Sequence, residues 1–145
     1  MTSLGYLLDV NFLVALAWPN HVSHVRARAW FLNERSDPFV TCPITESGFV
    51  RISMNPLVVT EQVSMASAIE ILERYRTRYP HQFWSDDLTL AEALAPFRHL
   101  TGHRQITDAY LLSLAINHQG RLVTFDKGIR ALPDAERLKN LLILE

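Results

Sequence analysis

The chain has 145 residues, of which 48% are hydrophobic and 20% are charged, and its formal net charge at pH 7 is −1. This length and composition suit one compact domain, which we expect to span residues 1–145. A net charge near zero excludes a global basic field for nucleic acid, so any such contact must use a local patch. Cys42 is the single cysteine, which excludes a disulfide within one chain and agrees with a reducing cytoplasm.

The amino-terminal segment lacks the charged start and the long apolar stretch of a signal peptide. The longest purely apolar run near it, Phe12 to Trp18, is too short to cross a bilayer. We therefore predict a cytoplasmic protein with no membrane partner.

The first part of the chain predicts a buried strand followed by two helices. Leu4–Asp9 is the apolar strand, and Asn11 is expected to cap a short helix that Pro19 ends. A longer helix is predicted over His21–Arg35, because apolar residues recur there with helical spacing. Its expected buried stripe is Val22, Val25, Ala29 and Leu32.

The middle of the chain repeats this alternation. Phe39–Cys42 is a second short strand, and Pro43 suits the first position of the helix that follows. Gln62–Tyr79 shows the clearest helical pattern, and Pro80 closes it. Its expected stripe is Met65, Ala68, Ile69, Leu72 and Tyr79.

The remaining elements are shorter. In chain order we expect a strand at Gln82–Trp84, a helix at Thr89–Leu94, a polar loop at Thr101–Gln105, an apolar helix at Thr107–His118 ended by Gly120, and strands at Arg121–Phe125 and Leu141–Leu144. Strands that alternate with helices indicate an α/β protein with a parallel sheet covered by helices on both faces.

Four acidic residues share one kind of position in this pattern. Asp9 and Asp126 each end an apolar strand, while Glu46 and Asp108 each lie in the first turn of a helix. In a parallel sheet, these positions meet at one edge, where ligands bind. Carboxylates brought together repel one another unless a cation joins them, and Mg²⁺ prefers oxygen ligands. The pattern therefore predicts a site for Mg²⁺ or Mn²⁺ and chemistry on phosphodiesters.

The residues around these acids resemble a known family. Leu8-Asp9-Val10-Asn11, the helix that carries Glu46, Thr107-Asp108-Ala109-Tyr110-Leu111 and Thr124-Phe125-Asp126 look like the four motifs of the PIN-domain ribonucleases. The stretch from Leu100 to Asp108 looks like the VapC toxins of bacterial toxin–antitoxin modules. The resemblance covers essentially the whole chain, and four motifs in order are far more specific than any one alone.

The resemblance implies a three-layer α/β/α sandwich with a central parallel sheet of four to five strands. It also implies a metal-dependent endoribonuclease that leaves a 5′ phosphate and a 3′ hydroxyl, a small inhibitory antitoxin as partner, and a homodimer. We expect Asp9, Asp108 and Asp126 to bind the metal and Glu46 to hold water or act as general base. The homodimer interface is expected at Phe49–Met54 or along the helix over Gln62–Tyr79.

Other residues are candidates for supporting roles. Asn11 either caps its helix or, as the resemblance implies, holds a metal-bound water or orients Asp9. Thr124 is expected to face the same side of its strand as Asp126 and to donate its hydroxyl to phosphate or water. Candidates for contacts with substrate phosphate are Arg51, His103 and Arg104. Each acid also has a purely structural interpretation, because Asp and Glu are common at turns and in the first turn of helices.

Two other functions compete with the metal-dependent nuclease. A phosphatase with an Asp-x-Asp nucleophile needs a second acid where this chain has Asn11. A non-catalytic RNA-binding or scaffold module is compatible with the same fold, since fold does not dictate function. The presence of all four acids favours the ribonuclease over both.

Overall fold

The computed structural model describes residues 4–97, 99–132, 134 and 137–145, which include a five-stranded parallel sheet. The strand order is β3-β2-β1-β4-β5. The strands are β1 (Tyr6–Leu8), β2 (Phe39–Thr41), β3 (His81–Phe83), β4 (Arg121–Thr124) and β5 (Leu141–Ile143). The expected α/β class and number of strands are confirmed.

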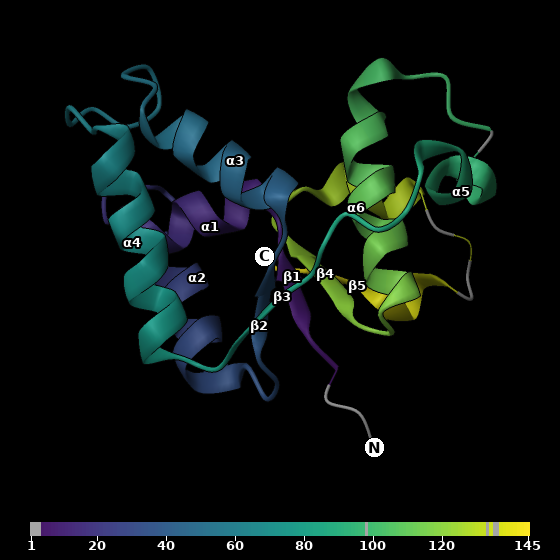
Figure 1. Ribbon diagram of the computed structural model, residues 1–145, viewed down its shortest axis with the longest axis horizontal. Coiled ribbons are helices and arrows are strands. Elements are labelled where there is room, and N and C mark those ends of the chain that lie inside the picture. The colour runs from purple at the N-terminus through teal and green to yellow at the C-terminus, as the bar shows by residue number, and fades with distance from the viewer. Residues whose placement is uncertain (1–3, 98, 133, 135–136) are drawn as a thin grey trace.

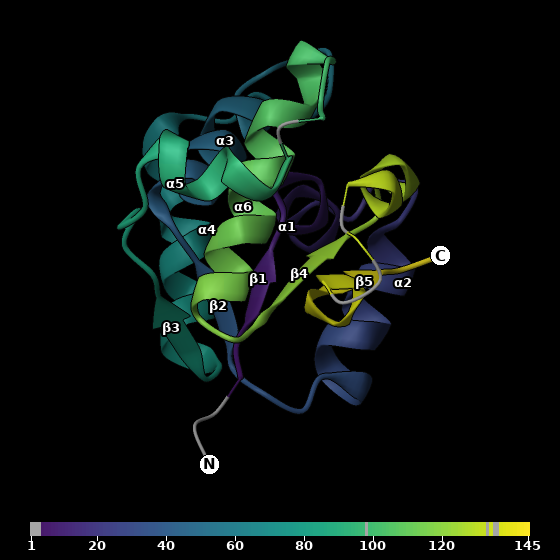
Figure 2. The ribbon, with the colours of Figure 1, turned by 90° about the vertical axis from the view of Figure 1, so that its right-hand side faces the viewer.

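Helices cover both faces of the sheet and give the molecule three layers (Figure 1). On one face lie α1 (Val10–Ala17), α2 (His24–Ala29), its π-helical continuation (Trp30–Glu34) and α4 (Met65–Arg78). On the other face lie α5 (Leu90–Leu94) and α6 (Ile106–Asn117). The helix α3 (Pro43–Ser53) follows β2 and packs against α1 and α4. After a quarter turn, Figure 2 shows α6 in front of the sheet. Short 3-10 helices cover Ala95–Phe97, His103–Gln105, Lys127–Ala131 and Arg137–Asn140.

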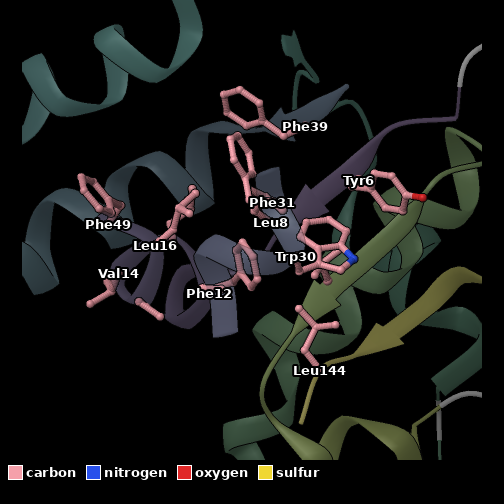
Figure 3. Close-up of a cluster of buried hydrophobic side chains, with 14 of the residues drawn as sticks. Tyr6, Leu8, Phe12, Val14, Leu16, Trp30, Phe31, Phe39, Phe49 and Leu144 are labelled. Atoms are coloured by element: carbon pink, nitrogen blue, oxygen red, sulfur yellow. The ribbon is translucent and has the colours of Figure 1, made fainter. Parts of the chain in front are cut away.

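The core is divided by the sheet because successive strand residues point to opposite faces. Tyr6 and Leu8 of β1 pack towards α1 and α2, whereas Leu7 packs towards α6. In the first layer the Trp30 ring meets Tyr6 edge to face at 5.1 Å and Phe12 at 5.4 Å (Figure 3). These aromatic contacts hold α1 against β1. They therefore fix the position of the short connection between the strand and the helix.

The helix predicted over His21–Arg35 differs from the structure in its extent and in its buried face. A turn occupies residues 21–23, α2 begins at His24, and the chain becomes π-helical at Trp30. Val22 and Val25 are 96% and 80% exposed, and the buried residues are Ala27, Trp30 and Phe31. The extra residue in the π-helical turn and the late helix start rotate the bulky aromatic side chains, not the valines, towards the sheet.

The helix predicted over Gln62–Tyr79 is shorter at its start. It begins at Met65, after Ser64, whose hydroxyl accepts a hydrogen bond from the Ser67 N–H at 3.1 Å. Ala68 and Leu72 are buried as expected, but Met65 and Ile69 are 57% and 43% exposed. These two side chains line a groove against α3 instead of facing the sheet.

The end of α6 also differs from the expectation that Gly120 takes the left-handed position. That position belongs to Gln119, with φ of 58°. Gly120 is required for another reason, because a Cβ there would lie 2.5 Å from the backbone oxygen of Gly5. Glycine thus allows β4 to start directly beside β1.

The order of the strands identifies the edge of the sheet at which a ligand is expected to bind. From β1 the chain proceeds outward to β2 and β3, and then returns to place β4 on the other side of β1. The carboxyl ends of β1 and β4 therefore form the point where the winding reverses, which is where open α/β sheets bind ligands. None of the helices formed by the described residues is long and apolar enough to cross a membrane.

Candidate active site

A buried hydroxyl joins the ends of β1 and β4. The Thr124 hydroxyl donates a hydrogen bond of 2.8 Å to Oδ2 of Asp9, and the hydroxyl oxygen of Thr124 accepts one of 3.0 Å from the backbone N–H of Asp126. The backbone N–H of Asp9 donates to the carbonyl of Val123 at 2.9 Å, which continues the pairing of the two strands. Thr124 is fully buried. It therefore fixes Asp9 and Asp126 relative to each other.

Asp9 itself is the N-cap of α1, which corrects the expectation that Asn11 caps this helix. Its Oδ1 accepts a hydrogen bond of 2.8 Å from the N–H of Val10, and Asn11 lies within the helix. The helix begins directly after the strand, so residue 9 is the one that meets the free N–H groups. The amide oxygen of Asn11 instead lies 3.3 Å from the Thr124 hydroxyl and accepts a 3.5 Å bond from the N–H of Phe125.

Three carboxylates are electrostatic neighbours at this edge. Asp108 lies half-buried in the first turn of α6, and burial, followed by the charges of Asp9 and Asp126, raises its pKa to about 7. The pKa of Asp9 is also raised, chiefly by burial and further by the charge of Asp126, although hydrogen bonds from Thr124 and Val10 oppose this. The sheet edge thus gathers negative charge that costs free energy.

No cation of the described chain neutralises this charge. Among the ion pairs between described residues, none involves Asp9, Asp108 or Asp126. Within the same ranges no three His, Cys, Asp or Glu side chains stand close enough together to hold a metal ion. The three aspartates therefore repel one another through space but do not form a ready-made metal site.

Glu46 has a different set of neighbours. It lies in the first turn of α3, and its Oε2 accepts a 2.6 Å hydrogen bond from the hydroxyl of Thr41, the last residue of β2. The carboxylate lines a groove of about 560 Å³ between α3 and α4, and none of the hydrogen bonds between described residues joins it to the three aspartates. The structure thus places Glu46 at the end of the strand next to β1, beside the aspartate group and not within it.

The remaining candidates lie on the surface around this edge. Arg51 is exposed on α3 and lines the same groove as Glu46. His103 and Arg104 are exposed in the short 3-10 helix that leads into α6, where a polar loop was expected. Asp126 is exposed and caps the 3-10 helix that follows it, since its Oδ1 accepts a 2.9 Å hydrogen bond from the N–H of Gly128.

Two polar residues near Glu46 were missed from the sequence. The Thr41 oxygen that bonds Glu46 is also 2.8 Å from Nε2 of His81 on the neighbouring strand β3. Alternation along β2 was the available signal, because Phe39 and Thr41 share one side of the strand. That Thr41 reaches both neighbours depends on the pairing of β2 with β3, which the sequence does not specify.

The fold, the reversal of winding and the acidic edge define a class of protein. The model of the PIN domain family matches residues 6–135, and the chain belongs to this family. Three relatives come from Mycobacterium tuberculosis. Ribonuclease VapC38 is 46% identical over 87% of this chain and 88% of that protein, and Ribonuclease VapC39 is 45% identical over 85% of this chain and 89% of that protein. Ribonuclease VapC44 is 44% identical over 90% of this chain and 94% of that protein.

Solved structures show the same fold at lower identity. The crystal structure of VapBC2 from Rickettsia felis bound to a DNA fragment from their promoter has a TM-score of 0.61, with 14% identity over 98% of this chain and 100% of that chain. The crystal structure of PAE2754 from Pyrobaculum aerophilum has a TM-score of 0.57, with 22% identity over 90% and 81%. The expected PIN-like three-layer sandwich is therefore confirmed.

Proposed function

We propose that this protein is a metal-dependent endoribonuclease and the toxin of a type II toxin–antitoxin module. The relatives named Ribonuclease VapC are 44–46% identical to it over most of both chains. The observation that carries the proposal is the group of Asp9, Asp108 and Asp126, whose charges no described cation compensates.

The donor atoms at this edge are of the type that a divalent ion prefers, although the side chains of the described residues would have to move closer together to enclose one. Their donor atoms are carboxylate oxygens, which Mg²⁺ and Mn²⁺ prefer, and a cation relieves the mutual repulsion that raises the pKa of Asp108. Asp9, Asp108 and Asp126 would hold the ion, with Thr124 fixing the orientation of Asp9. When bound, the ion would acidify water and stabilise negative charge on the scissile phosphate.

The chain itself supplies the positioning and the proton transfer. Glu46 has one oxygen occupied by Thr41, and no described residue donates a hydrogen bond to its Oε1, which leaves that oxygen to accept a proton from the attacking water. His103 and Arg104 are exposed around the edge and would bind backbone phosphates. Attack by water in this arrangement leaves a 5′ phosphate and a 3′ hydroxyl.

The proposal is tested by incubating the protein with total cellular RNA in Mg²⁺, in Mn²⁺ and in chelator, and by sequencing the new 5′ ends. We expect discrete cuts that require the metal and disappear with Asp9→Asn. This variant keeps an oxygen for the helix cap while removing the charge. Cuts that persist in excess chelator would contradict the metal-dependent mechanism.

The competing function is a non-catalytic RNA-binding module. It predicts RNA binding without new 5′ ends, even with added Mn²⁺ and with folded protein free of antitoxin. The retention of all four acids at one edge favours the nuclease, because a binding module gains nothing from uncompensated negative charge near a polyanion.

The antitoxin partner would bind to the same negatively charged aspartates. An arginine of a small protein inhibitor pairs bidentately with carboxylates, and Asp9, Asp108 and Asp126 lack a described partner of that kind. We expect a crystal structure of the toxin–antitoxin complex to show an inhibitor arginine against these aspartates. A complex in which the antitoxin leaves them untouched would contradict this arrangement.

A homodimer through α3 and α4 completes the proposal. The part of the groove formed by the end of α3 and the start of α4 is lined by apolar side chains that remain exposed or half-buried in one copy, chiefly Val50, Met54, Met65 and Ile69. Glu46 lies at the opposite end of α3, in its first turn, and stays outside this contact. Light scattering after gel filtration should give twice the mass of one chain. Met65→Glu, which places charge on this face, should shift the protein to the monomer, and an unchanged dimer would locate the interface elsewhere.

A further inference from the structure

Three polar side chains from three different elements form a continuous hydrogen-bonded row. Thr41 at the end of β2 is fully buried and donates its hydroxyl proton to Oε2 of Glu46 at 2.6 Å. Nε2 of His81 lies 2.8 Å from the same hydroxyl oxygen. A hydroxyl has one proton, and Thr41 uses it for Glu46, so its oxygen accepts the second bond from an N–H on Nε2 of His81.

We infer that Thr41 and His81 are positioning residues that hold the Glu46 carboxylate in place for its proton transfer from water. The inference rests on the proposed ribonuclease function and adds two residues to its machinery. Glu46 would otherwise rotate freely about its side-chain bonds at the wall of an open groove. A fixed Oε2 also fixes Oε1, which accepts no hydrogen bond from a described residue.

The strand pairing makes this row rigid. His81 lies directly opposite Phe39 in the register between β2 and β3, and the two rings are 4.7 Å apart. Thr41 follows Phe39 by two residues, so both side chains point to the face from which His81 approaches. His81 is half-buried, packs against the Phe39 ring and is hydrogen-bonded to Thr41, and these contacts restrict the rotation of its side chain.

The charge state of His81 agrees with the direction of these bonds. The pKa of His81 is lowered to about 4, chiefly by burial and also by the charge of Arg76, while the charge of Glu73 opposes both. The groups facing it are therefore Arg76 and Glu73 from α4 and, through Thr41, Glu46 from α3. At neutral pH the imidazole carries one proton, which the geometry assigns to Nε2.

If Thr41 had only a structural role, as a buried hydrogen-bonding partner, its removal would also lower the stability of the protein. The two roles differ in kinetics. A positioning role predicts that Thr41→Val lowers kcat about tenfold with KM unchanged, the loss expected for one hydrogen bond to a charged group. Thr41→Ser, which keeps the hydroxyl, should recover most of kcat.

Ser53→Ala is the matched control for stability. Ser53 is also fully buried, lies at the other end of α3, and accepts a hydrogen bond of 2.9 Å from the indole N–H of Trp18. Its loss should lower the melting temperature as Thr41→Val does while leaving kcat within about twofold of wild type. Equal losses of kcat in Ser53→Ala and Thr41→Val would overturn the positioning role.

The decisive measurement is a double-mutant cycle with Glu46→Gln. Each variant is assayed in Mn²⁺ on an RNA oligonucleotide that contains a cut site mapped in the cellular RNA pool. If Thr41 acts through Glu46, Thr41→Val should cost nothing further in the Glu46→Gln background. Independent, multiplying losses would contradict the inference, whereas a wild-type protein that cuts no RNA would contradict the proposed function itself.

A readout that does not depend on activity concerns His81. Long-range ¹H–¹⁵N NMR spectra at pH 7.5 should show neutral His81 with its proton on Nε2. His81→Phe should lower kcat as Thr41→Val does, and His81→Gln, whose amide N–H can reach the same oxygen, should lower it less. A proton on Nδ1, or wild-type kcat in both His81 variants, would show that His81 does not help to position Glu46.

Discussion

Thr124 and Asp9 lie 115 positions apart in the sequence and are joined by a 2.8 Å hydrogen bond from the hydroxyl of one to Oδ2 of the other. The bond crosses from β4 to the end of β1 and is fully buried at the Thr124 side. Because Oδ1 of Asp9 accepts the N–H of Val10, both oxygens of this carboxylate have defined directions. Asp9 is therefore preorganised by its own helix on one side and by Thr124 on the other.

Removal of the Thr124 hydroxyl should weaken metal binding more than folding. We expect Thr124→Val to lower the affinity for Mn²⁺ about tenfold, since groups that orient a ligand typically contribute 10–100-fold to metal affinity. Thr124→Ser should stay near wild type. Isothermal titration calorimetry measures both, and an unchanged affinity in Thr124→Val would show that Asp9 keeps its orientation without this bond.

Asp108→Asn should stabilise the metal-free protein at neutral and higher pH. The pKa of Asp108 is raised from 3.8 to about 7 in the folded state, so the folded protein binds the proton more tightly than the unfolded chain. Its contribution to the free energy of unfolding is therefore complete below pH 4 and is lost as the pH rises to about 7. With solvent screening of this half-buried group, the difference at pH 8 is about 1–2 kcal/mol, or roughly 3–6 °C in melting temperature.

The measurement is thermal unfolding of both proteins in chelator at pH 4, 6 and 8. The advantage of Asp108→Asn should grow with pH across this series. Added Mn²⁺ should raise the melting temperature of the wild type but not that of the variant, because the variant lacks one of the proposed ligands. A constant difference between the two proteins at all three pH values would contradict the burial of this charge.

His81 should give the opposite dependence on pH. Its pKa falls from 6.5 to about 4 on folding, so the unfolded chain binds the proton more tightly than the folded protein. Its contribution to stability is present above pH 6.5 and is lost as the pH falls towards 4. Urea unfolding at pH 7.5 and 5 should therefore show a smaller loss of stability for His81→Gln than for wild type. Parallel losses would mean that His81 titrates normally in the folded protein.

Gly48→Ala should weaken the packing of α1 against α3. A Cβ at this position would lie 2.5 Å from Cγ2 of Val10, whose branched side chain has little freedom to move away within a helix. We expect a loss of about 1–3 kcal/mol in the free energy of unfolding and reduced cleavage, because the two helices carry Asp9 and Glu46 at their starts. Urea unfolding and the RNA cleavage assay measure the two effects.

The second change Val10→Ala makes room for the added methyl group, so it should restore part of both properties in Gly48→Ala. Gly102→Ala is the matched control, because its Cβ would meet only the flexible Gln105 side chain, at 3.2 Å. Failure of Val10→Ala to improve the Gly48→Ala protein would show that the loss arises within α3 and not at its contact with α1.

The sequence predicted the sheet and the positions of the acids because apolar runs and turn residues mark strand ends directly. It predicted the wrong cap for α1, since Asp and Asn are both good caps and only the abrupt start of the helix decides for Asp9. The buried face of α2 was also wrong, because a π-helical turn at Trp30 breaks the 3.6-residue period. The bond between Thr41 and Glu46 was missed because it depends on a side-chain direction that no spacing encodes.

The central place of β1 has a consequence for how the protein is made in the cell. Asp9 precedes its two neighbours Asp108 and Asp126 in the chain by 99 and 117 residues, so it is synthesised well before them. β4 inserts beside β1 only once residues 121–124 have been synthesised, and Thr124 has no partner on Asp9 before then. Under the proposed function, a nascent chain therefore cannot cleave RNA until β4 has been synthesised and has paired with β1.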